Sequence, residues 1–155
     1  MSSAPEHNLS PAPEQNAGLA QALHRARLLG RADLPHSETA YEFQGHDHGE
    51  IGASVIVVDA PPSSGPKLHK HPYAEIFVVL AGQATFTAGE DVIEAVGGQI
   101  VVVPAGVPHK FVNSGTGPLR QVDIHPSGQF ITEWLEDCSS SLSERRGHSS
   151  LGVLV

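Results

Sequence analysis

The chain has 155 residues, of which 39% are hydrophobic, a size and composition that fit one domain with one sizeable core. Acidic residues number 17 against 9 lysines and arginines, the net charge is −8, and no basic cluster occurs, so nucleic-acid binding lacks its electrostatic pattern. No apolar run approaches the roughly 18 residues that span a bilayer, and no signal-peptide pattern opens the chain, so we expect a cytoplasmic protein without membrane contact. The single cysteine, Cys138, excludes an internal disulfide and a cysteine-rich zinc site.

The two ends of the chain differ in composition from its centre. Residues 1–18 are rich in Ser, Pro, Ala, Asn and Gln, and residues 139–155 are Ser-rich and polar before a short apolar end, so we expect a disordered N-terminal tail and a flexible C-terminal tail. The folded domain is then expected at residues 19–138. At its start, residues 17–29 have apolar side chains at helical spacing, but their end could equally be an edge strand.

Short β-rich runs separated by Gly and Pro occupy the centre of the chain. They are expected as strands at residues 41–43, 53–59, 67–71, 75–80, 84–87, 92–95, 100–103, 110–112 and 119–125. Nine short strands at nearly regular spacing indicate an antiparallel barrel or sandwich. Apolar side chains expected to line its interior are Phe77, Val79, Phe86 and Phe111.

A short helix is predicted after the last of these strands. Within residues 129–137, four apolar side chains fall on one helical face and three acidic ones on the other: Phe130, Ile131, Trp134 and Leu135 against Glu133, Glu136 and Asp137. The pattern predicts one or two helical turns that lie on the β-domain.

Three histidines and one glutamate have the spacing of a metal site built on strands. Side chains alternate along a strand, so His69 and His71 project from one face, and Glu75 keeps that parity across a bend at Pro72. His109 follows a turn that can return a distant strand to the first one. Imidazole and carboxylate ligands suit Fe, Mn, Ni, Co or Zn, and a six-coordinate ion would keep two positions open.

The residues around these four form two motifs. The first reads HxH, three residues, Glu, six residues and Gly, from His69 to Gly82; the second reads Gly, five residues, PxG, two residues, His, three residues and Asn, from Gly98 to Asn113. Together they resemble the signature of the cupin superfamily, and among its members the small, single-domain, quercetin-dioxygenase-like proteins. One position departs from the pattern, because three residues separate Gly65 from His69 where the family has five.

The resemblance implies a single-domain, all-β, antiparallel cupin β-barrel of the double-stranded β-helix or jelly-roll type. It implies a divalent metal held by His69, His71, Glu75 and His109, and frequent dimerisation. We expect a homodimer to which the Phe130–Leu135 stretch or the early strands contribute. The motif glycines are interpreted as turn residues, and Asn113 as a residue whose amide ties the following hairpin to the barrel.

Two further residues are candidates for catalysis beside Glu75. Along residues 120–125 the side chains alternate, which places Gln121, Asp123 and His125 on a polar face that is either solvated or lines a wet cavity near the metal. In the second case His125 could move protons near neutral pH. Tyr73 shares parity with His71 and Glu75, so it could contact substrate unless Pro72 breaks the alternation.

These residues give one leading functional hypothesis and two alternatives. The leading one is a metal-dependent, O2-using, dioxygenase-type oxidoreductase that acts on a small organic molecule, with Glu75 as a possible base. A metal-dependent decarboxylase, lyase or isomerase would instead need a proton donor such as His125 or Tyr73 near the ion. A non-catalytic cupin that only binds a small molecule is the alternative from another class.

Overall fold

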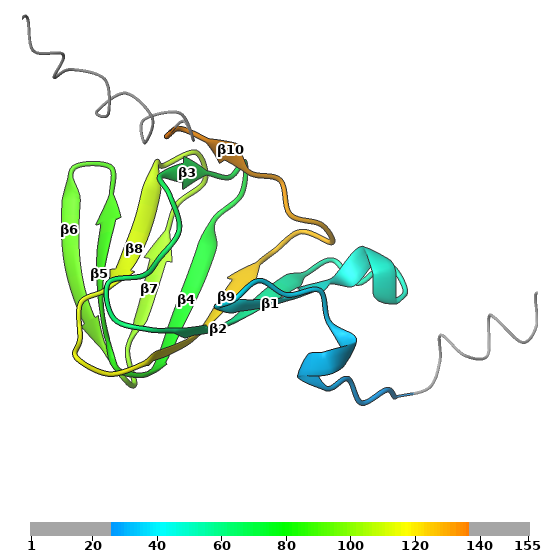
Figure 1. Cartoon of the computed structure of the whole chain (residues 1–155). Helices are drawn as coiled ribbons and strands as arrows, with labels where there is room; N and C mark the ends of the chain where they lie inside the picture. The colour runs from blue at the N-terminus through cyan, green and yellow to red at the C-terminus, as the bar shows by residue number, and fades with distance from the viewer. Residues whose placement is uncertain (1–25, 137–155) are drawn as a thin grey trace, which may run out of the picture.

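Two five-stranded antiparallel sheets face each other in the computed structural model, which describes residues 26–136 (Figure 1). One sheet has the strand order β1-β2-β9-β4-β7 and the other β10-β3-β8-β5-β6. The first sheet consists of β1 (Ala40–Gln44), β2 (Ser54–Ala60), β9 (Leu119–His125), β4 (Glu75–Ala81) and β7 (Ile100–Val103). The second consists of β10 (Glu133–Trp134), β3 (His69–Lys70), β8 (His109–Asn113), β5 (Gln83–Ala88) and β6 (Asp91–Val96).

The predicted all-β, antiparallel architecture is confirmed, and each of the nine predicted runs contains a strand. No strand pairing joins the two sheets within residues 26–136, so the arrangement is a two-sheet sandwich and closure into a barrel is not seen. Two short 3₁₀ helices lie outside the sheets, η1 (Arg31–Asp33) and η2 (Gly45–His48). Among the described residues, no helix has the length and apolar character needed to cross a bilayer.

The core lies between the two sheets and is centred on three phenylalanines. The Phe77 ring from β4 lies 5.0 Å from the Phe86 ring of β5 and 6.0 Å from the Phe111 ring of β8, measured between centroids. All three are buried, as is Val79, which confirms the four interior positions expected from the sequence. Tilted and edge-on ring pairs of this kind stabilise a core beyond the apolar area that they bury.

The end of the second motif is fixed by side-chain hydrogen bonds. Asn113 is buried, and its Nδ2 donates to the Ala60 and Gly117 carbonyls, each at 2.9 Å, while its Oδ1 accepts from the Gly115 N–H at 2.9 Å. The predicted role of this amide in tying the hairpin to the β-domain is therefore confirmed. Gly65, which stands nearer to His69 than the family pattern has it, packs so tightly that an added Cβ would lie 1.9 Å from the Phe111 carbonyl oxygen.

The predicted C-terminal helix is wrong, because residues 129–136 form an extended segment that we call the C-terminal strap. Its short strand β10 pairs with β3. The Ile131 N–H donates to the Tyr73 hydroxyl at 3.0 Å, and the Leu135 N–H donates to the Leu68 carbonyl at 2.9 Å. A helix this short forms few internal hydrogen bonds, which do not offset the free-energy cost of nucleating it. The hydrogen bonds to β3 and its neighbours therefore decide the conformation, in spite of the helical spacing of the apolar residues.

Ion pairs at the surface hold the strap to the second sheet. Lys70 Nζ lies 3.1 Å from Glu133 Oε1, and Lys110 Nζ lies 2.7 Å from Glu136 Oε1. Ile131, Trp134 and Leu135 remain exposed on the strap, and dimerisation through this stretch stays a prediction.

The start of the described chain carries neither of the elements expected there. Residues 26–30 have no regular structure, and the rest of the predicted helix or edge strand at residues 17–29 lies outside the described residues. The two predicted tails, 1–18 and 139–155, also lie outside them, so the domain limits stay predictions.

Candidate metal centre

Strand pairing brings the four predicted metal ligands together from three parts of the chain. His69 on β3 lies opposite His109, the first residue of β8, and Glu75 is the first residue of β4. The turn before β8 is tied to the first motif because the Gly106 N–H donates to the His71 carbonyl at 2.8 Å. All four side chains are buried, and one potential ligand atom from each lies within 4.8 Å of those of the other three.

Backbone carbonyls orient all three histidines in the same way. The Nδ1 atoms of His69, His71 and His109 lie 2.7 Å, 2.8 Å and 2.8 Å from the carbonyl oxygens of Lys67, Ile131 and Val107. A carbonyl can only accept, so each Nδ1 carries the proton and each neutral ring has its lone pair on Nε2. Metal-binding histidines are commonly held by this kind of second contact.

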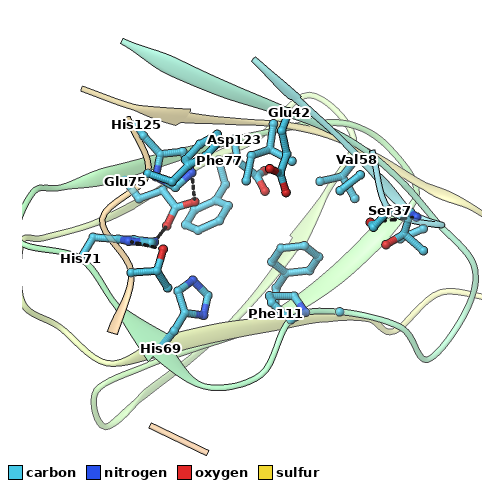
Figure 2. A pocket seen from close by; sticks show the side chains of 18 of the residues that line it. Ser37, Glu42, Val58, His69, His71, Glu75, Phe77, Phe111, Asp123 and His125 are labelled. Atoms are coloured by element: carbon cyan, nitrogen blue, oxygen red, sulfur yellow. Dashed lines mark hydrogen bonds and ion pairs between the residues drawn. The ribbon is translucent and has the colours of Figure 1, made fainter. Parts of the chain in front are cut away.

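The Nε2 atoms of two of these rings point at one carboxylate oxygen. Glu75 Oε2 lies 2.8 Å from His109 Nε2. The same oxygen lies 3.1 Å from His71 Nε2 (Figure 2). His71 Nε2 is buried and makes no well-aligned hydrogen bond among the described residues. A neutral ring with its lone pair facing a carboxylate is unfavourable unless a cation or a proton lies between them. The donor set and this unsatisfied nitrogen therefore fit a divalent ion.

The electrostatics of the cluster agree with a site that holds positive charge. Burial acts to raise the pKa of Glu75, but contacts with His109, His125 and His71 outweigh it and hold that pKa far below the usual range. Burial acts to lower the pKa of His71, but Glu75 and the Ile131 carbonyl raise it overall. Burial lowers the pKa of His69, which keeps its imidazole neutral and able to bind a metal.

His125 lies beside the cluster without the carbonyl contact that the other histidines share. Its Nε2 is 3.1 Å from Glu75 Oε1, the oxygen that His71 and His109 do not use. The ring is only 2% exposed, so the alternative of a surface histidine is wrong, and its Nδ1 has no hydrogen-bond partner within residues 26–136. Its Nε2 also makes no well-aligned hydrogen bond among these residues, although it lies close to the Glu75 carboxylate.

Tyr73 does not reach the space in front of the cluster. Its ring stacks on the His71 ring at 5.2 Å, and its hydroxyl accepts the Ile131 N–H bond of the strap. The bend at Pro72 breaks the alternation on which its predicted substrate contact depended. In this structure Tyr73 supports a ligand histidine and the strap.

A cavity of about 420 Å³ opens in front of the ligand cluster, within the size range of small-molecule sites (Figure 2). Its walls come from β1, β2, β4, β8, β9 and the strap, and Trp134 and Phe130 close it from the strap side. His69, His71, Glu75 and His125 line one part of it. Asp123 also lines it, so the polar face of β9 borders a cavity and is not a solvated surface.

Two carboxyl groups line this cavity, and the sequence had not assigned either of them an individual role in the site. Asp123 was expected only as a member of a polar face, and it accepts a 2.6 Å hydrogen bond from Gln121 Nε2 deep between the sheets. Glu42 on β1 was not singled out, although Tyr41, Glu42 and Phe43 already show the alternation that turns one polar residue inward.

Replacing Asp123 by Asn is expected to stabilise the metal-free protein at pH 7 by about 1 kcal/mol or more. Burial, reinforced by the Glu75 charge, raises the pKa of Asp123 well above the ordinary 3.8. The folded chain therefore binds this proton more tightly than the unfolded chain, and stability falls as pH rises from the unfolded pKa towards the folded one. Thermal unfolding across pH should show a gain that vanishes below about pH 4. A gain that is the same at all pH values would contradict this account.

Comparison with known proteins agrees with this architecture. The cupin domain model matches residues 56–125. The xanthan biosynthesis protein XanB of Xanthomonas campestris pv. campestris is 34% identical over 117 residues, which are 73% of this chain and 25% of that protein. An uncharacterised protein of Streptomyces coelicolor is 33% identical over 61 residues, 39% of this chain and 56% of that one. This chain thus spans about a quarter of the xanthan protein's length.

Solved structures with the same fold include oxalate decarboxylase of Bacillus subtilis. One structure of a mutant form aligns with a TM-score of 0.59 at 21% identity, covering 66% of this chain and 29% of that chain. The structure at pH 4.6 aligns with a TM-score of 0.58 at 20% identity over the same shares. A cupin domain is therefore matched over residues 56–125, and the solved structures show a fold of the same kind.

Proposed function

We propose that this chain is a metal-dependent enzyme that transforms a small organic molecule by an O2-dependent, dioxygenase-type oxidation. The observation that carries the metal-dependent part is that backbone carbonyls orient His69, His71 and His109 in the same way, with the Nε2 atoms of His71 and His109 at the Glu75 carboxylate. A divalent ion held by these four residues would supply Lewis-acid or redox chemistry and keep coordination positions free.

The chain's own residues supply the remaining functions of such a site. The Phe77 and Phe111 side chains exclude water from the cavity and offer apolar contact to a substrate. Glu75 can accept a proton through Oε1, and His125, 3.1 Å away, can receive it or return it. An apolar cavity of this kind suits O2 and a weakly polar substrate, which supports oxidation as the reaction class.

Proton-transfer chemistry without O2 is the second candidate, as in a decarboxylase, lyase or isomerase. It is favoured by Asp123, a carboxyl group at a wall of the same cavity whose pKa burial raises towards neutral pH, and by His125 beside Glu75. The Bacillus subtilis oxalate decarboxylase that shares this fold has Mn(II) centres. Low identity limits that likeness to the fold, so it supports no particular substrate.

Elemental analysis of protein purified without added metal is the first test, with the His69→Ala, His109→Ala double variant as the metal-free control. O2 consumption is then measured over a panel of phenols, diketones and small acids. Stoichiometric metal with substrate-dependent O2 uptake supports the oxidation. CO2 release or proton exchange without O2 uptake supports the second candidate, and binding without turnover supports a non-catalytic cupin.

A further inference from the structure

The charge of the cavity wall restricts what can bind in it. Of the described residues that line the cavity, none is a lysine or an arginine, whereas Glu42 and Asp123 add two carboxyl groups to that of Glu75. The Glu42 carboxylate makes no hydrogen bond or ion pair with any other described residue. Its oxygens are therefore available to a ligand.

Strand register places these two carboxyl groups on the same wall. Glu42 of β1 lies opposite Ile56 of β2, and Ile56 lies opposite Asp123 of β9, so the three side chains project from the same face of the first sheet. Figure 2 shows Glu42 and Asp123 on one side of the cavity near Phe77. Gln121 holds Asp123 Oδ1, and no hydrogen bond from residues 26–136 engages the other oxygen.

The balance of charge disfavours an anionic ligand even when a metal is bound. A divalent ion together with the Glu75 carboxylate and neutral imidazoles carries one net positive charge, which the Glu42 carboxylate alone cancels. A dicarboxylate such as oxalate would then bring two negative charges into a low-dielectric cavity with no cationic side chain to receive them. An uncharged hydroxyl group instead finds acceptors on Glu42 and Asp123.

The rest of the wall favours a ligand with an apolar body. Val58 and Phe77 of the first sheet and Phe111 of the second face the cavity, and the rings of Phe130 and Trp134 border it on the strap side. A small dicarboxylate would leave these surfaces without contact, whereas an aromatic or similarly apolar ring would bury them.

We propose that Glu42 and Asp123 determine specificity in this site by accepting hydrogen bonds from the hydroxyl group of an uncharged ligand with an apolar body, and by excluding small carboxylate anions. This inference rests on the proposed function only in taking the cavity as the substrate site. The two residues are assigned a role in binding, separate from that of the four metal ligands.

A matched pair of probes tests the inference: 2-naphthol, which is uncharged at pH 7, and 2-naphthoate, which has the same ring system and a negative charge. Trp134 is the one tryptophan of the chain and lines the cavity, so quenching of its fluorescence reports binding. The protein as purified is expected to bind 2-naphthol about tenfold more tightly than 2-naphthoate. Glu42→Gln and Asp123→Asn should each strengthen 2-naphthoate binding, by about tenfold for Glu42→Gln.

Glu90→Gln is the control, since it removes the same charge from an exposed turn outside the cavity and should leave both affinities unchanged. Equal affinity of the wild-type protein for the two probes, or unchanged 2-naphthoate binding in both cavity variants, would overturn the inference. Metal content is measured on every sample, and the titrations are repeated after metal removal. If the protein as purified holds no metal but still prefers 2-naphthol over 2-naphthoate, the proposed function is contradicted and the inference is supported. If it holds metal but shows no such preference, the inference is contradicted and the proposed function is supported.

Discussion

Replacing His109 by alanine is expected to lower the affinity for a divalent metal by more than about a hundredfold. The substitution removes one of three neutral donors and the 2.8 Å contact between His109 Nε2 and Glu75 Oε2. The remaining residues cannot replace it, because the fourth nearby imidazole, His125, faces the other Glu75 oxygen and lacks a carbonyl that would fix its tautomer. Metal content after dialysis, followed by titration against a chelator of known affinity, measures the loss.

His46→Ala is a suitable control for that experiment, because His46 is exposed on η2 and contacts only Asp47 and Glu50 through its ring nitrogens within the described chain. Its metal content should match that of the unchanged protein. The double variant His69→Ala, His109→Ala should retain none. Stoichiometric metal in the double variant would show that the ion binds elsewhere.

Much of the fold and the ligand set follows from local pattern. The alternation along β9 predicted that Gln121, Asp123 and His125 share one face but not whether that face is solvated, and the structure buries it. The spacing of His69, His71, Glu75 and His109 was sufficient to anticipate their clustering, because strand parity and a single turn fix most of the geometry. These features lie on short segments, in which the residue types alternate with the same two-residue period as the side chains of a strand.

The errors arose where long-range contacts decide the conformation. The strap has a helical pattern, yet its backbone bonds to Tyr73 and Leu68, more than 50 residues away in sequence, and no local signal encodes those partners. Tyr73 has the right parity, but the bend at Pro72 turns it onto the His71 ring. Glu42 reaches the cavity only because β1 joins β2 and β9 in one sheet, which the sequence of β1 alone does not determine.

Ending the chain at residue 128 is expected to weaken metal binding by about ten- to a hundredfold, whereas ending it at residue 138 should leave binding unchanged. The shorter chain loses the Ile131 carbonyl, which accepts the Nδ1 proton of His71 at 2.8 Å and so keeps the lone pair of that ring on Nε2. It also loses the cavity wall formed by Phe130, Thr132 and Trp134. The longer chain keeps the whole strap and both of its lysine–glutamate ion pairs.

Chelator titration of the two chains measures the difference, with circular dichroism to compare their β-structure. Tyr73→Phe in the full chain provides a finer version of the same test, because it removes only the hydroxyl that accepts the Ile131 N–H bond and leaves the carbonyl in place. Its effect on metal affinity should be less than about tenfold, since one neutral hydrogen bond is lost while the His71 contact remains. A chain ending at residue 128 that stays folded and binds metal as tightly as the longer one would show that His71 is oriented without the strap. The strap would then serve only as a wall of the cavity.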